Sequence, residues 1–347
     1  MAAREPFRLG GREIAPGSRG TLDLPVSVLS NHMPVGLAAH VIHGRRAGPV
    51  MFVSAGVHGD EVIGVEIVRR LLAMEQLARL AGTLIAIPIV NMLGFLAHSR
   101  YLPDRRDLNR AFPGYSDGSL AARLAHLMMS EIVSRADVGI DLHSAAIHRH
   151  NLPQIRISPE SERARELARA FGAPVILEAG LRAGSLRAAA REAGVEVLLF
   201  EGGEGLRFDE MTARAGVSGI LRVMRHLGMI PARGVSRPRR SPVLCRESRW
   251  LRAPQGGLVR FFRATGEVVA AGDVLAAVAG PFGETEAPLI SPAGGIIIGR
   301  AVMPVVNEGD ALVHLGAIAS AEHAERAVEA LTGQLSVDPL FDEDEII

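Results

Sequence analysis

The feature that most constrains the fold is a series of apolar segments that alternate with segments of helical periodicity. Segments typical of buried strands occupy residues 46–60, 83–91, 138–143, 173–180 and 195–203, the first running into a glycine-rich loop. Segments with apolar residues at helical spacing occupy residues 61–80, 120–136, 160–172 and 185–194. Strands that are apolar throughout must be covered on both faces, so the alternation predicts an α/β fold. Such sheets place ligand sites where their strands end.

The pattern changes near residue 232, where a stretch rich in proline and arginine predicts a linker. Beyond it, residues 248–316 contain short apolar runs punctuated by glycine and proline, which predict a small all-β module. The motif V-x-x-G-D occurs at 269–273 and again at 306–310, which suggests two quasi-equivalent halves of one barrel. Residues 318–332 predict a helix, and the acidic tail 338–347 is expected to be mobile or packed against a neighbour.

Length and composition narrow the class of protein. The chain has 347 residues, enough for a large domain over 1–235 and a second region over 236–347 that holds the linker, the β module and the tail. Its 38 basic and 38 acidic residues cancel, so neither nucleic acid nor a membrane is expected as a partner. A small-molecule partner is expected instead, and a homo-oligomer is possible.

Two residue counts exclude further classes. The single Cys245 excludes an internal disulfide framework and a cysteine-rich metal site. The chain contains no lysine, which excludes Schiff-base chemistry and lysine-linked cofactors. The N-terminus has no apolar core of signal-peptide length, and no apolar run approaches the roughly 20 residues of a membrane span. We therefore expect a cytoplasmic protein.

Three residues at predicted strand ends form a candidate metal site. His58 and Glu61 lie where a strand passes into a helix, three residues apart, so both side chains can reach one ion. His143 ends another predicted strand, and Asp141 could orient its ring. Two imidazoles and one carboxylate leave a position open for water, as in catalytic zinc sites, so we expect one Zn²⁺ per chain. Cobalt, nickel or manganese would accept the same ligands.

The alternative for this motif is structural. An isolated H-x-x-E pair is common, His58 could cap a helix, and Glu61 could complement the helix dipole. The placement of the pair after an apolar strand favours the metal site. The remaining histidines lack such a context and are interpreted as surface or core residues: His98, His126, His226 and His314.

A polar loop and a terminal carboxylate complete the candidate site. Residues 91–114 are too polar for the core and carry four arginines: Arg100, Arg105, Arg106 and Arg110. Arginine suits bidentate recognition of carboxylates, and the pair Asn109–Arg110 looks positioned between apolar neighbours. Glu201 follows the apolar run of 195–203 directly and is a candidate general base, with Glu204 as its competitor.

Together these motifs resemble the succinylglutamate desuccinylase/aspartoacylase family, a branch of the zinc carboxypeptidase-like fold. The resemblance rests on GVHGDE (56–61), DLNRAFPG (107–114), DLH (141–143) and FEGG (200–203). It spans about residues 1–235, continues into the β module, and implies a mixed sheet with helices on both faces.

The resemblance also implies roles for individual residues. His58, Glu61 and His143 would bind zinc, and Glu201 would activate water. The remaining residues with implied roles would hold a substrate carboxylate or support the developing oxyanion: Asn109, Arg110 and Arg100.

The segment SRYLPDRRDLNRAFPG (99–114) resembles a bacterial deacylase-like subgroup, which includes enzymes that deacetylate N-acetyl-diaminobutyrate. Residues 148–156 are expected to form a loop after the third ligand, where Arg149 and Asn151 would contact substrate. The C-terminal module resembles barrel-sandwich domains of the lipoyl/biotinyl type. Without lysine it cannot carry a lysine-linked arm, so a lid or an oligomer contact is expected.

The predicted function is therefore a zinc-dependent amidohydrolase. It would remove an acetyl- or succinyl-type acyl group from a small, carboxylate-bearing N-acylated amino acid by metal-activated water. A zinc carboxypeptidase acting on short peptides is an alternative that would use the same machinery. A non-catalytic metal- or ligand-binding protein is a second alternative, which the presence of Glu201 beside three candidate ligands disfavours.

Overall fold

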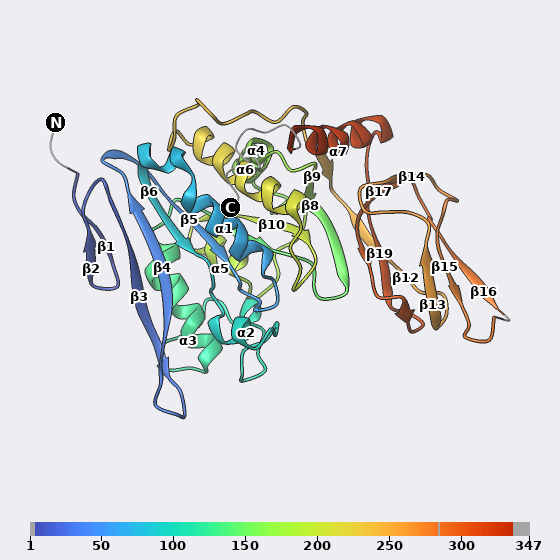
Figure 1. Cartoon of the computed structure of the whole chain (residues 1–347), viewed down its shortest axis with the longest axis horizontal. Coiled ribbons are helices and arrows are strands. Elements are labelled where there is room, and N and C mark those ends of the chain that lie inside the picture. The colour runs from blue at the N-terminus through green and yellow to red at the C-terminus, as the bar shows by residue number, and fades with distance from the viewer. Residues whose placement is uncertain (1–3, 284, 336–347) are drawn as a thin grey trace.

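A large mixed sheet forms the frame of the molecule (Figure 1). The computed structural model describes residues 4–283 and 285–335, so the predicted acidic tail at 338–347 lies outside the described residues. Along the main path of the sheet the strands follow the order β12-β19-β17-β8-β10-β7-β5-β6-β4-β3. The four central strands are mutually parallel: β10 (Glu196–Gly203), β7 (Val138–His143), β5 (Arg46–Ala55) and β6 (Ala81–Ile87).

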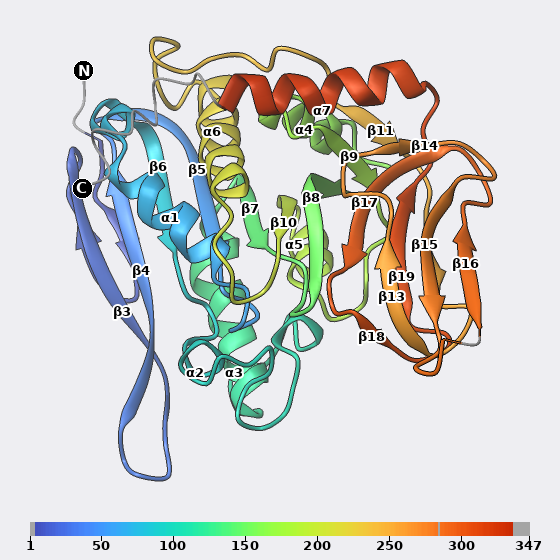
Figure 2. The same cartoon turned by 45° about the vertical axis from the view of Figure 1, so that its right-hand side comes forward.

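Antiparallel strands extend this parallel centre on both sides. On one side lie β4 (Pro34–His43) and β3 (Ser18–Val28), which form a long hairpin projecting from the body (Figure 2). On the other side β8 (Arg149–Ile157) pairs antiparallel with β10. Two further strands continue from β8 in parallel, and a separate pair stands near the N-terminus: β9 (Val175–Glu178), β11 (Val243–Cys245), β1 (Phe7–Leu9) and β2 (Arg12–Ile14).

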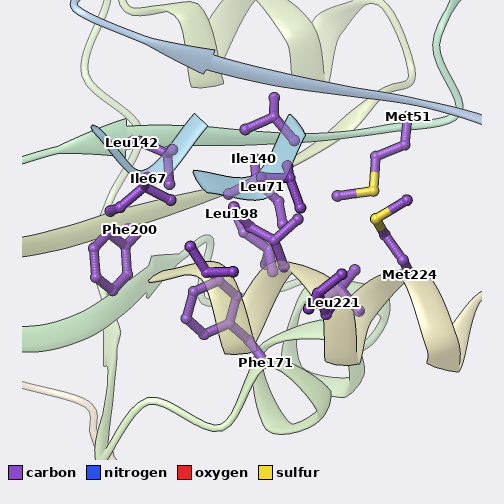
Figure 3. Close-up of a cluster of buried hydrophobic side chains, with 14 of the residues drawn as sticks. Met51, Ile67, Leu71, Ile140, Leu142, Phe171, Leu198, Phe200, Leu221 and Met224 are labelled. Atoms are coloured by element: carbon purple, nitrogen blue, oxygen red, sulfur yellow. The ribbon is translucent and has the colours of Figure 1, made fainter. Parts of the chain in front are cut away.

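Helices cover both faces of the parallel centre, which confirms the predicted fold class. One face carries α1 (Ile63–Ala73), α4 (Glu162–Phe171) and α6 (Glu210–His226). The other face carries α3 (Leu120–Leu127) and α5 (Leu186–Glu192). Alternate residues of β5 serve the two cores: Met51 belongs to the first and Phe52 to the second. Figure 3 shows the first core, which includes Phe171 of α4 and Phe200 of β10. The centres of these two rings are 5.5 Å apart.

Two predicted helices are shorter than expected. The segment 61–80 divides into α1 and a 3₁₀ turn over Glu75–Arg79. The segment 120–136 divides into α3, a π-helical turn over Met128–Ile132 and a 3₁₀ turn over Val133–Arg135. Apolar periodicity continues through these changes of helix type, so it does not reveal them.

The predicted loop at 148–156 is wrong, because this segment is strand β8. The polar residues Asn151 and Gln154 interrupt its apolar pattern and conceal the strand in the sequence. Both are buried and hydrogen-bonded: Asn151 donates to Glu201, and Gln154 donates to the carbonyl of Ile298. The sequence analysis also did not predict α6 or the strands before residue 46.

The C-terminal region contains the expected antiparallel β module. Its strands are β12 (Ser248–Arg252), β13 (Gly257–Phe261), β14 (Val268–Val269), β15 (Val274–Ala279), β16 (Glu286–Ile290), β17 (Gly295–Ala301), β18 (Val305–Val306) and β19 (Ala311–Gly316). Strands β16-β15-β13-β18 form a second sheet, and residues of both sheets share one core. The two V-x-x-G-D copies form matching turns, in which Asp273 and Asp310 each accept a bond from the backbone N–H three residues earlier.

The module is joined to the rest of the sheet by main-chain pairing. Strand β17 pairs antiparallel with β8, so hydrogen bonding runs without a break from the parallel centre into the module. Helix α7 (Ala321–Leu335) returns over the first region, where Leu331 and Leu335 pack against Ala215 of α6. The division at residues 235 and 236 stays a prediction. Within the described residues no helix is both long and apolar enough to span a membrane.

We expect Gly59→Ala to destabilise the fold, because Gly59 approaches the backbone of the short helix α2 (Met92–Leu96) too closely for a side chain. A Cβ atom there would lie 1.9 Å from the carbonyl carbon of Gly94. Thermal or urea unfolding should show a loss of about 1–3 kcal/mol. Gly333→Ala in α7 is the matched control, because nothing lies within 4 Å of its Cβ position. Equal stability of the Gly59 variant and the wild type would contradict the expectation.

Candidate active site

The three predicted metal ligands meet at the carboxyl ends of two neighbouring strands. His58 follows β5, Glu61 precedes Val62, the N-cap of α1, and His143 is the last residue of β7. Because β5 and β7 are parallel and paired, their carboxyl ends lie side by side. One ligand atom from each residue can be chosen so that all lie within 4.8 Å of one another, and all three residues are buried.

The Glu61 carboxylate lies between the two imidazoles. Its Oε1 is 2.6 Å from Nδ1 of His58, and its Oε2 is 2.7 Å from Nδ1 of His143. The backbone N–H of Ser144 donates to Oε2 as well. Burial raises the pKa of Glu61, but the charges of the two histidines outweigh burial and hold that pKa well below its usual range. The carboxylate is therefore kept ionised at this point.

Each imidazole also faces a second carboxylate with its other nitrogen. Nε2 of His58 lies 3.1 Å from Asp107, and Nε2 of His143 lies 2.7 Å from Asp141. Burial lowers the pKa of His143, but Asp141 and Glu61 together raise it well above the ordinary value. Carboxylates in this position fix the ring tautomer of metal-binding histidines and leave Nδ1 as the ligand atom. The donor set and its outer partners therefore fit a zinc ion held by His58, Glu61 and His143.

The predicted role of Asp141 as the group that orients His143 depends on which face its side chain occupies. Residues two apart in a strand point to the same face, so Asp141 and His143 share one side of β7. Ser54 of the neighbouring β5 donates to the other oxygen of Asp141 at 2.7 Å. The buried Asp141 carboxylate is thus held on both oxygens.

The predicted anion loop lies across this cluster. Arg100 lies between two carboxylates: its Nη1 is 3.3 Å from Oε1 of Glu61, and its Nη2 is 3.0 Å from Oδ2 of Asp107. Asp107 accepts a bond from the backbone N–H of Asn109 and so begins a 3₁₀ turn over Leu108–Arg110. The Asn109 side-chain oxygen accepts from the backbone N–H of Leu186, the first residue of α5. The loop is thereby fixed to both the ligands and a helix.

The structure places Glu201 beside the cluster and Glu204 away from it. Glu201 pairs in register with His143, so the two side chains share one face of the sheet. Asn151 donates to one oxygen of Glu201 at 2.8 Å, and Arg156 lies 3.2 Å from the other. Glu204 does not line the cavity around the cluster and instead accepts a bond from the backbone N–H of His148.

One cavity of about 630 Å³ brings the predicted residues together. It is lined by every residue that the sequence assigned to the site: His58, Glu61, Arg100, Asn109, Arg110, His143, Arg149, Asn151 and Glu201. The sequence analysis missed further residues of its wall: Arg156, Arg182, Arg187, Ser248, Trp250 and His314. No local motif marks these residues. The last three belong to the C-terminal module, which therefore forms part of the cavity wall.

Comparison with known proteins identifies the family. A family model described as the succinylglutamate desuccinylase/aspartoacylase catalytic domain matches residues 47–227, more than half of the chain. This chain belongs to that family. Members of the family hydrolyse amide bonds, and this chain is a hydrolase of that class.

Individual members of the family match over most of the chain. An N-alpha-acetyl-L-2,4-diaminobutyric acid deacetylase of Halomonas elongata is 28% identical over 306 residues, which cover 84% of this chain and 89% of the relative. A family protein from Rhodobacter sphaeroides is similar with a TM-score of 0.78 and 26% identity, covering 87% of this chain and 96% of that one. The product-bound structure of the ectoine utilization protein EutE (DoeB) from Ruegeria pomeroyi is similar with a TM-score of 0.77 and 25% sequence identity. The match covers 86% of this chain and 94% of that chain.

For this family member we expect Asp141→Asn to weaken zinc binding, because the amide no longer fixes the His143 tautomer. Loss of such an outer partner typically lowers metal affinity about 10–100-fold. Competition with a chromogenic chelator measures the change. Asp23→Asn, at an exposed position of β3, is the control and should leave affinity unaltered. Unchanged affinity in the Asp141 variant would show that this carboxylate has no influence on the ligand.

Proposed function

We propose that the chain is a zinc-dependent deacylase of small N-acylated amino acids. The observation that carries the proposal is the placement of Glu201 beside a buried His-Glu-His cluster inside one cavity. The named activity of the Halomonas relative and the product-bound Ruegeria structure support the same substrate class.

His58, Glu61 and His143 would hold the ion. A bound zinc ion supplies Lewis acidity, which polarises a carbonyl group and lowers the pKa of water. The protein supplies a site that is shielded from solvent, since the three side chains are almost fully buried. The outer carboxylates Asp107 and Asp141 keep both imidazoles in the orientation that binding requires.

Glu201 would act as the proton carrier. Its side chain lies in the cavity on the same sheet face as His143, where it can accept a proton from attacking water and give it to the leaving amine. Asn151 and Arg156 each contact one oxygen of this carboxylate and so fix its direction. We infer that Asn151, predicted as a substrate contact, acts mainly through Glu201.

The arginine loop would bind the rest of the substrate. Asn109 has its oxygen committed to α5, so its amide N–H groups are the atoms left to bind a ligand, and both Asn109 and Arg110 line the cavity. These donors suit the substrate α-carboxylate. Arg100, beside Glu61, would support negative charge that develops on the acyl oxygen. Arg149 lines the same cavity and remains a proposed substrate contact.

The size of the cavity favours a small substrate over a peptide. A volume of about 630 Å³ suits a ligand of a few tens of atoms, and the module contributes Trp250 to its wall. A carboxypeptidase would need the cavity to admit an extended chain. A cytoplasmic location and association into a homo-oligomer stay predictions from the sequence.

The direct test is metal content followed by amine release on the same sample. We expect about one zinc per chain and chelator-sensitive release of primary amine from N-acetyl or N-succinyl amino acids. N-formyl amino acids and short unblocked peptides complete the panel. Amine release from peptides alone would support the carboxypeptidase, and a protein that binds no zinc after supplementation would contradict the proposal.

Glu201→Gln should lower kcat by about 100-fold or more while zinc stays bound, because the amide cannot carry the proton. Glu204→Gln is the matched control, three residues along the chain and outside the cavity wall, and should keep nearly full activity. Metal analysis of both variants separates loss of the base from loss of the ion. Full activity in the Glu201 variant would assign the base elsewhere.

A further inference from the structure

A second pocket lies at the end of the sheet opposite the candidate active site. It has a volume of about 850 Å³ and lies beside the starts of β5 and β6. Figure 2 shows these starts at the far end of the sheet from α2, which follows β6. Strand β5 has 10 residues, so roughly 30 Å separate the pocket from the metal cluster. A ligand in this pocket cannot reach the cluster, so it is not a substrate of the proposed deacylase.

Four arginines surround this pocket, and no acidic side chain among the described residues lines it. They come from the start of β3, from the connection between β4 and β5, and from the 3₁₀ turn before β6: Arg19, Arg45, Arg46 and Arg79. All four are exposed, and none forms an ion pair with a carboxylate in the described part of the chain. By contrast, Arg69 and Arg70 of the nearby α1 both pair with Glu66. The pocket therefore gathers positive charge that no described carboxylate cancels.

Two of these side chains are positioned by the backbone around the pocket. Arg46 donates through Nη2 to the carbonyl of Arg79 at 2.9 Å, and its other guanidinium nitrogens form no hydrogen bond with the described residues. Arg45 lies along Gly17, where a Cβ atom would be 2.4 Å from its Nε. Gly17 also has a φ of +80°, which glycine adopts without strain. Glycine at this turn therefore gives the Arg45 side chain its place at the pocket.

A fifth arginine adds charge behind the wall. Arg4 donates through Nη1 to the carbonyls of Gly44, Arg46 and Gly82, and through Nη2 to the hydroxyl of Thr83. All four acceptors are neutral, so they hold the guanidinium in place without cancelling its charge. Burial lowers the pKa of Arg4, as expected for a cation that is removed from water without an anionic partner. An anion in the pocket would be attracted by this fixed charge as well.

The rest of the wall is uncharged and partly apolar. Ile42, Leu77 and Leu80 are buried, and Pro231 is half-buried. Burial lowers the pKa of His43, which also lines the pocket, so its ring is neutral at physiological pH. The pocket thus combines exposed guanidinium groups with an apolar surface.

We propose that this pocket binds an organic polyphosphate of nucleotide size, of the class of the nucleoside triphosphates. Planar guanidinium groups pair bidentately with phosphate oxygens. Four of them exceed what a single carboxylate can engage, whereas a triphosphate presents several charged groups in succession. The apolar side chains would accommodate the ring of the ligand, and the volume lies within the range of roughly 300–1,000 Å³ that is usual for ligand pockets. This site does not depend on the proposed deacylase activity.

Calorimetry on the zinc-loaded, full-length protein tests the proposal with three compounds. ATP contains the phosphate chain and the ring, adenosine lacks the chain, and inorganic tripolyphosphate lacks the ring and the sugar. We expect one ATP per chain and binding of adenosine that is weaker by about 100-fold or more, because adenosine forms none of the charge-assisted hydrogen bonds. Tripolyphosphate should bind about tenfold more weakly than ATP, because it leaves the apolar surface uncovered.

Three outcomes of this comparison would overturn the proposal. The first is no binding of ATP, and the second is equal binding of adenosine. The third is binding of tripolyphosphate as tight as that of ATP, which would indicate an adventitious anion only. Titration of the metal-free protein with ATP should give the same affinity, because the pocket is remote from the metal cluster.

Charge reversals locate the ATP site. Arg19 and Arg45 are exposed, so Arg19→Glu and Arg45→Glu should fold normally and each weaken ATP binding about tenfold or more. Arg79→Gln removes a charge without adding the opposite one and should weaken binding several-fold, with thermal unfolding as the check on the fold of all three variants. Arg246→Glu makes the same reversal at an exposed position outside the pocket and should leave the affinity unaltered.

One further variant separates this pocket from the active-site cavity, which also contains arginines. Arg182 is an exposed residue in the wall of that cavity, so Arg182→Glu should leave ATP binding unaltered. Loss of ATP binding in the Arg182 variant, with full affinity in the Arg19 and Arg45 variants, would place the phosphates in the active-site cavity and overturn the proposal. Equal affinity in every variant would overturn it as well.

Discussion

The rest of the site depends on one buried carboxylate. Glu61 is almost fully buried, and an isolated charge at such depth is prohibitively costly. Its two oxygens contact His58, His143, Arg100 and the backbone N–H of Ser144. These partners come from the ends of two strands and from the loop at 91–114, so the folded chain must bring three distant segments together to stabilise one side chain. The same requirement brings the candidate metal ligands and the arginine loop together.

The features of this arrangement that depend on short sequence motifs and on the order of the strands could be predicted from the sequence. Apolar strand segments lead directly to His58, His143 and Glu201, and they bring those side chains to one sheet edge because parallel strands share a direction. The turn motif V-x-x-G-D likewise marked two equivalent turns of the module, because the aspartate bonds to a backbone N–H within the same few residues. Both features were predictable because the first follows from the shared direction of the strands and the second joins residues only three positions apart.

The parts that could not be predicted depend on contacts between distant segments. Arg187 appears in the sequence as one arginine of an ordinary helix, and only the fold shows that it is buried beside the cavity. Trp250 and His314 are 64 positions apart along the chain and meet through strand pairing within the module. Strand β8 was mistaken for a loop because its buried polar residue Asn151 serves the site rather than the core.

Strand β8 connects the module to the hydrolase region, because it pairs with β10 on one side and with β17 on the other. On one side Asn151 donates to Glu201 of β10, and on the other the same residue pairs in register with Gly299 of β17. A Cβ atom at position 299 would lie 2.5 Å from the Asn151 side-chain oxygen, so a side chain there would displace the amide that contacts Glu201. At its start, β8 places Arg149 over Trp250. The proposed proton carrier and the aromatic part of the cavity wall are therefore both positioned by one strand, and a shift of the module would disturb both.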